Sequence, residues 1–116
     1  MHRIYEIPIA DVYPHYLTKV ISKGRSEAEL KEVICWLTQT TKSELASYLE
    51  NKTSFREFFA VTKLHPIAAK ITGSICGVKI AEIEDPLMKR IRYLDKVVDE
   101  LSKGKTLEKI FRSGVK

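Results

Sequence analysis

Two aspartates near the end of the chain have the type and spacing that could support chemistry. Asp95 and Asp99 are four residues apart in a pattern typical of a helix, so their carboxylates lie one turn apart on one face. Such a pair could hold a divalent metal ion or share a proton. No third ligand is evident, and Arg92 and Lys103 are close enough along the helix to form ion pairs with them. We therefore favour a solvated charged face and predict no metal site.

A cysteine and a histidine form a second candidate. Cys76 is the nearest residue to a nucleophile in this sequence, and His65 is the nearest to a base. Thiol catalysis requires a cysteine of low pKa that is partly exposed and oriented by a partner, and spacing alone establishes none of these. We interpret Cys76 as a buried structural residue and predict no catalytic residue and no cofactor. Cys35 and Cys76 are too few for a disulfide scaffold or a four-ligand zinc site.

Several aromatic and amphipathic residues are expected at the edges of the helical apolar stripes, only half buried. Such residues are enriched where proteins bind partners, although ordinary core edges contain them too, and we favour the core-edge interpretation. With the neighbouring charged residues they make up the candidate partner-binding set: Tyr13, His15, Trp36, Arg92, Tyr93, Asp95 and Asp99.

The net charge of +5 comes almost entirely from the end of the chain. The last fourteen residues contain five basic side chains and one acidic side chain, whereas residues 1–60 contain eight of each. A nucleic-acid-binding domain normally spreads its cations over a folded face. A polyanion- or RNA-associated role is therefore the alternative function, and it would use Lys103, Lys105, Lys109 and Arg112.

Residues 41–62 resemble a helix-turn-helix, since Ser43-Glu44-Leu45-Ala46 is similar to the start of many such motifs and Ser54 opens a second short helix. Their chemistry does not fit one. The second helix offers Phe55, Phe58 and Phe59, with Arg56 as its single cation. Base contacts need polar side chains on that face. An ordinary helical hairpin is the better interpretation.

The elements that must position these residues are short helices. Ile4, Ile7 and Ile9 around Pro8 predict an extended N-terminal arm, because proline disfavours a helix there. Asp11 is expected to cap the first helix, which Gly24 ends. Three further helices begin at serine or threonine caps followed three residues later by glutamate, namely Ser26, Thr41 and Ser54.

The second half of the chain combines one ambiguous segment with one strong helix. Residues 67–77 predict a central helix buried on both sides, with Gly73 in a row of small residues. Residues 78–80 after it are extended in pattern, which makes a short strand or β-bridge around Val78 an option. Asp85-Pro86 is a strong helix start. Apolar residues follow at spacings of 4, 3, 4 and 3 up to Gly104, and Thr106 can cap a final short helix.

These elements predict an all-α fold over residues 1–116: one compact domain of five to six short helices with an extended N-terminal arm and one minor β-bridge as an option. A chain of 116 residues that is 44% hydrophobic and 30% charged can bury one core. No apolar run is long enough to span a membrane, and the first residues lack the pattern of a secretory signal. We expect a cytoplasmic protein that does not bind membranes.

The sequence resembles a small bacterial family called domain of unknown function 2200. The stretches that carry the resemblance span nearly the whole chain: Met1–Tyr5, Val12–Pro14, Lys23–Arg25, Trp36–Thr38, Ile71–Gly73, Ile75–Gly77, Glu84–Met88, Ile91–Lys96 and Asp99–Leu101. The family's name implies no activity, substrate or cofactor. The leading hypothesis is a non-enzymatic binding module of the bacterial cytoplasm whose partner is a protein or a second copy of the chain. An enzyme that uses Cys76 or the Asp95/Asp99 pair ranks third, after the polyanion-binding alternative.

Overall fold

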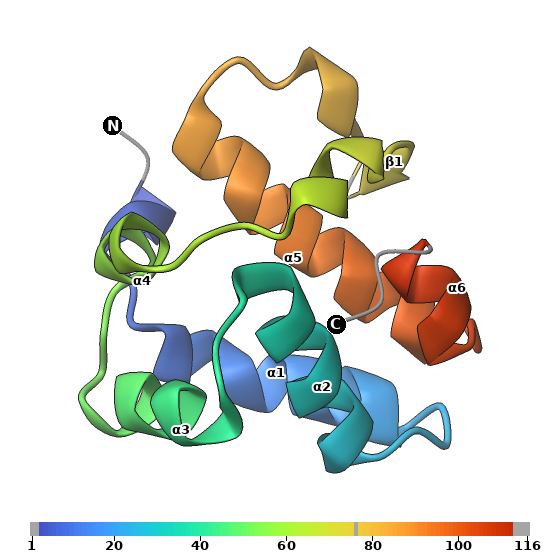
Figure 1. The fold of residues 1–116 in the computed structure, drawn as a ribbon, viewed down its shortest axis with the longest axis horizontal. Helices are drawn as coiled ribbons and strands as arrows, with labels where there is room; N and C mark the ends of the chain where they lie inside the picture. The colour runs from blue at the N-terminus through green and yellow to red at the C-terminus, as the bar shows by residue number, and fades with distance from the viewer. Residues whose placement is uncertain (1–2, 76, 113–116) are drawn as a thin grey trace.

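The computed structural model describes residues 3–75 and 77–112, which form a globule of helices with one small β-hairpin (Figure 1). The α-helices are α1 (Ile9–Ile21), α2 (Glu27–Thr38), α3 (Lys42–Glu50), α4 (Phe55–Val61), α5 (Pro86–Ser102) and α6 (Leu107–Phe111). Three 3-10 helices and two strands complete the fold: η1 (Arg3–Glu6), η2 (Pro66–Lys70), η3 (Ile80–Glu82), β1 (Ser74–Ile75) and β2 (Val78–Lys79). The predicted mainly α-helical fold class is confirmed.

Helix α5 is the centre of the fold, and it contacts α1, α2, α4, α6, η3 and β1. Asp85 caps it by accepting hydrogen bonds from the amides of Leu87 and Met88, with Pro86 in the first turn. The predicted apolar seam is buried at Ile91, Leu94, Val98 and Leu101. The helix ends at Ser102, and Gly104 follows with a φ of +95°, a conformation that glycine adopts without strain. The start, the seam and the end of this helix are as predicted.

The predicted helix starts at Ser26, Thr41 and Ser54 are also present. The hydroxyls of Ser26 and Thr41 accept a hydrogen bond from the amide three residues later, and the glutamate side chain at that position accepts one from the backbone amide of the cap residue. Ser54 accepts a hydrogen bond from the Glu57 amide. Helix α4 packs Phe55, Phe58 and Phe59 into the core, so these side chains are not available to contact bases. The Tyr48 ring of α3 meets Phe58 edge to face, with centroids 5.4 Å apart.

The N-terminal segment differs from the extended arm that we predicted. Residues 3–6 form the 3-10 helix η1, and only Pro8 is extended, where it forms an isolated β-bridge with Ser54. Helix α1 begins at Ile9, and its N-cap is Pro8 rather than Asp11. Proline readily adopts the extended backbone angles of the N-cap position. Pro8 therefore separates the 3-10 helix η1 from α1, and the rest of the segment is not extended.

The predicted central helix over residues 67–77 is wrong beyond Lys70. Gly73 has a φ of +93°, which ends any helix, and a two-residue hairpin follows in which Ile75 pairs with Val78. The glycines belong to turns rather than to a helix face packed against a neighbour. The isoleucines at 71, 75 and 80 are still buried, because this irregular segment covers one side of α5. Cys76 lies outside the described residues.

Among the residues that the structure describes, none of the helices has both the length and the apolar character needed to cross a bilayer.

Candidate functional site

Asp95 and Asp99 are both held in ion pairs on α5. Arg92 contacts Asp95 at 2.9 Å, and Lys103 contacts Asp99 at 3.0 Å, so both predicted partners are confirmed. Helix α1 adds two contacts that the sequence did not reveal: the Tyr16 hydroxyl donates to Asp95 at 2.6 Å, and the Lys19 ammonium lies 2.9 Å from Asp99.

The expectation that this face is solvated is wrong at Asp99, which is only 8% exposed because α1 packs over it. Burial by itself raises the pKa of the Asp99 carboxyl, but the hydrogen bonds from Lys19 and Lys103 outweigh burial and hold the pKa below its usual range. Asp99 is therefore a charged residue that ties α1 to the end of α5. Within residues 3–75 and 77–112, no three histidine, cysteine or acidic side chains gather into a group that could hold a metal ion.

The aromatic members of the candidate set are dispersed. Tyr13 is half buried on α1 and donates a hydrogen bond to Glu27 at 2.8 Å, whereas His15 is exposed on the same helix. Trp36 and Tyr93 were expected to be half buried, but they are only 4% and 8% exposed and belong to the core. The structure therefore does not bring the candidate set together in one surface.

The cations of the alternative polyanion set are mostly engaged within the protein. Lys105 and Arg112 both contact Glu100, at 3.2 and 2.5 Å, and Glu100 is 5% exposed. Lys103 pairs with Asp99, as described above. Lys109 is exposed on α6. The basic segment is thus a packed part of the domain as far as Arg112, because buried acidic residues of α5 lie beneath it.

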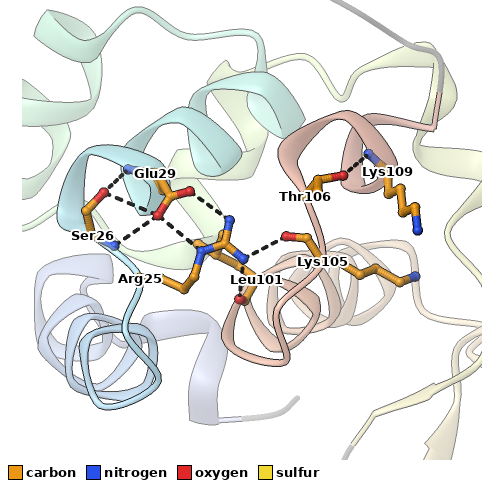
Figure 2. Close-up of polar contacts among 7 residues, drawn as sticks. All are labelled: Arg25, Ser26, Glu29, Leu101, Lys105, Thr106 and Lys109. Carbon is orange, nitrogen blue, oxygen red and sulfur yellow. Dashed lines mark hydrogen bonds and ion pairs between the residues drawn. The ribbon is translucent and has the colours of Figure 1, made fainter.

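Arg25 fastens this segment to α2 (Figure 2). Its guanidinium donates to the carbonyl oxygens of Leu101 and Lys105, at 3.1 and 2.7 Å, and binds both carboxylate oxygens of Glu29. The pairing with Arg25 is the largest of the causes that lower the pKa of Glu29 to about 2. The Leu101 carbonyl, in the last turn of α5, also accepts a hydrogen bond from the Gly104 amide at 3.2 Å, so Arg25 is an additional donor to it.

A concave pocket of about 380 Å³ lies beside the C-terminal half of α2. It is lined by one row of α2, the turn into α3 and a histidine from the segment before η2: Glu32, Cys35, Trp36, Gln39, Thr40, Thr41, Lys42 and His65. Cys35 and His65 are half buried, and Lys42 is exposed at the first residue of α3.

Hydrogen bonds between α2 and residues 63–65 hold the walls of this pocket. The Gln39 side-chain amide donates to the carbonyl of Leu64 at 2.9 Å, and the backbone amide of His65 donates to the carbonyl of Leu37 at 2.8 Å. The hydroxyls of Thr38 and Thr40 lie 3.0 Å apart in the turn. Because these contacts join both walls, the pocket is already formed without a ligand.

Three stacked rings support the His65 side of this pocket. The Trp36 ring stacks against His65 with centroids 4.8 Å apart and against Phe111 with centroids 5.0 Å apart. The Nδ1 atom of His65 accepts a hydrogen bond from the amide of Ile67 at 3.0 Å. An accepting Nδ1 carries no proton, so the proton of the neutral ring is on Nε2, which is a donor.

Sequence reasoning singled out Trp36 and His65 separately and missed the site that they share. The row of Glu32, Cys35, Trp36 and Gln39 has helical spacing, and this second stripe on α2 was the available signal. Nothing in the sequence indicated that residues 63–65 return to the end of α2. Cys35 lines the pocket together with His65, whereas Cys76, the cysteine that we considered with His65, lies outside the described residues.

Comparison with known proteins gives a family for this chain. The family model DUF2200, described as an uncharacterized protein conserved in bacteria, matches residues 3–112. The chain belongs to this family. The resemblance to DUF2200 inferred from the sequence is therefore confirmed over nearly its full length.

One solved structure has the same fold as this DUF2200 member. It is described as the crystal structure of uncharacterized protein SP1917, and it shares 38% sequence identity with a TM-score of 0.91. The match covers 100% of this chain and 96% of that chain. No curated protein matches the chain. Because neither description states an activity, any role for the pocket has to be argued from its geometry.

Proposed function

We propose that this DUF2200 protein is a non-enzymatic binding module of the bacterial cytoplasm and that its ligand site is the pocket between α2, the start of α3 and His65. The observation that carries the proposal is the preformed pocket of about 380 Å³, lined by Cys35, Trp36 and His65 together with several polar side chains. Ligand sites in proteins are typically concave, largely apolar and formed before binding, with volumes of about 300–1,000 Å³. This pocket fits that description.

Binding rather than catalysis is supported by the state of the strongest candidate acids. Asp95 and Asp99 are each neutralised by basic side chains, so they tie helices together. A general acid or base needs a pKa near the working pH, whereas the pKa of Asp99 is shifted downward.

A fragment screen followed by nuclear magnetic resonance tests this proposal. Trp36 lines the pocket and is the single tryptophan of the chain, so its indole N–H gives one unambiguous signal from a residue of the site. We expect fragments to shift this signal together with the amides of residues 39–42 and 65. Shifts confined to other surfaces, or no shifts with any fragment, would contradict the proposal.

A pair of matched variants sharpens this screen. Cys35→Leu adds volume at a half-buried position that lines the pocket, whereas Val61→Leu adds a similar group at a position that is 63% exposed on α4. We expect Cys35→Leu to weaken fragment binding at least tenfold and Val61→Leu to leave it unchanged. Melting temperatures of both variants check that each remains folded.

The alternative, a polyanion-binding role for the basic end of the chain, receives less support because three of its cations contact buried acids. The five basic side chains of the last fourteen residues can neutralise about five phosphates, which limits the slope of log affinity against log salt for duplex to about −4.5. Binding to labelled duplex and RNA can be measured over a salt series for the parent and for Lys105→Gln/Lys109→Gln. Tight binding that the double variant abolishes would favour the alternative over the pocket.

A further inference from the structure

We infer that the pocket binds a small planar aromatic molecule that carries an anionic group such as a carboxylate. This inference rests on the proposed function, because it assigns a ligand class to the same pocket. It joins two features of the lining: a flat ring held rigidly at one wall, and two donors to an anion, the Lys42 ammonium and the Nε2–H of His65.

The flat surface is the imidazole of His65. One face of this ring is covered by Trp36, which is itself stacked on Phe111, so the ring cannot turn freely. His65 is nevertheless only half buried and lines the pocket, which leaves the rest of its ring open to a ligand. Aromatic rings prefer stacked or edge-to-face contacts with one another, and each such pair contributes beyond the area that it buries. A planar aromatic ligand should therefore bind more tightly against the His65 ring than an aliphatic ligand of equal size.

The polar groups of the pocket favour an anion. The imidazole presents an Nε2–H donor, since its Nδ1 atom accepts from the Ile67 amide. Lys42 adds an exposed ammonium group at the rim. Glu32 is the acidic residue of the lining, and it already takes part in an interaction within the protein. A carboxylate on the ligand would pair with Lys42 and accept a charge-assisted hydrogen bond.

The volume limits the size of the ligand. About 380 Å³ lies near the lower end of the range for small-molecule sites, which suits one or two fused rings with a short acidic side chain. A dinucleotide or another large cofactor would not fit.

Three probes of similar size separate the contributions of ring and charge. Indole-3-acetate has a planar ring and a carboxylate, tryptamine has the same ring with an ammonium group, and cyclohexylacetate has the carboxylate without a planar ring. With ¹⁵N-labelled protein, we expect indole-3-acetate to shift the Trp36 indole N–H and the amides of residues 39–42. Its affinity should exceed that of each other probe by at least tenfold.

Two variants test the residues that carry the inference. His65→Asn removes the ring but retains a side-chain oxygen that can accept from the Ile67 amide, because asparagine is a favoured cap. Lys42→Gln removes the charge at the rim. We expect each variant to weaken the binding of indole-3-acetate at least fivefold. Lys23→Gln changes an exposed lysine in the turn after α1 and should leave the affinity for indole-3-acetate within twofold of the parent.

The outcomes separate the ligand class from the binding site. If tryptamine or cyclohexylacetate binds the pocket as tightly as indole-3-acetate, or if Lys42→Gln and His65→Asn leave binding unchanged, the inference about the ligand fails. The inference about the ligand also fails if fragments occupy the pocket but none of the three probes binds there. In that case the pocket is still a binding site, and the proposed function is supported without this ligand class. If no fragment and no probe binds there, both the inference and the proposed function fail.

Discussion

The indole of Trp36 on α2 stacks on the phenyl ring of Phe111 on α6, with their centroids 5.0 Å apart and their planes 23° apart. This contact joins residues 75 positions apart and makes the short C-terminal helix part of the core. Ile110, beside Phe111, is fully buried. The end of the chain up to Arg112 is therefore a structural element, and its Lys105 and Arg112 side chains pair with the buried Glu100.

Replacing Phe111 with alanine should destabilise the domain by about 3 kcal/mol, because a phenyl ring that is 6% exposed is lost and Trp36 loses its stacking partner. Urea unfolding measures the loss, and the fluorescence of Trp36 reports whether its surroundings change in the folded state. Leu107→Ala, at a half-buried position of the same helix, is the control and should lower the free energy of unfolding by less than Phe111→Ala does. Equal stability of Phe111→Ala and the parent would show that α6 is not docked in solution.

Replacing Arg25 with glutamine should lower the free energy of unfolding by about 2 kcal/mol, because the guanidinium binds two backbone carbonyls and a carboxylate at once. Arg25→Lys should recover little, since a lysine cannot reproduce the forked geometry. Thermal unfolding compares these variants with Lys31→Gln, which removes an exposed ion pair with Glu27 and should change stability by less than about 1 kcal/mol. Full recovery with lysine would mean that charge alone matters at this position.

The stability of the protein should fall between about pH 4.5 and pH 2, partly because of Glu29. The hydrogen bonds from Arg25 lower the pKa of Glu29 from its ordinary value of 4.5 to about 2 in the folded protein. The unfolded chain therefore takes up this proton first as the pH falls, so the contribution of Glu29 is complete above about pH 4.5 and is lost as the pH approaches 2. Urea unfolding at several pH values should show a shallower fall in Glu29→Gln. An unchanged pH profile in this variant would contradict the prediction.

Replacing Gly73 distinguishes a strained turn from a tightly packed helix. The φ of +93° at Gly73 is costly for any residue with a side chain, whereas an added Cβ would meet only the Lys96 side chain, at 3.4 Å. We therefore expect Gly73→Ala and Gly73→Leu to destabilise the protein by similar amounts, about 1–2 kcal/mol each. In the helical interpretation that the structure replaces, leucine would cost much more than alanine through overpacking. Chemical unfolding of both variants separates the two explanations.

Much of the secondary structure could be predicted from the sequence because its signals are local. The caps at Ser26 and Thr41 and the Asp85-Pro86 start act within one helical turn. Apolar spacing in the same way identified the buried face of α5. Local signals failed at Pro8, where two helical turns meet, and at Gly73, where a glycine of a turn occupied a position that also fitted a helix.

The candidate site depended on contacts between distant segments, which no local pattern specifies. The sequence by itself determined that Trp36 would lie beside the core stripe of α2 and that Asp95 and Asp99 would have basic neighbours. Only the tertiary structure decided that α1 covers Asp99 and that His65 stacks on Trp36. The physical reason is that burial and pocket shape depend on which surfaces come together when the chain packs, whereas helix periodicity determines only which residues share a face.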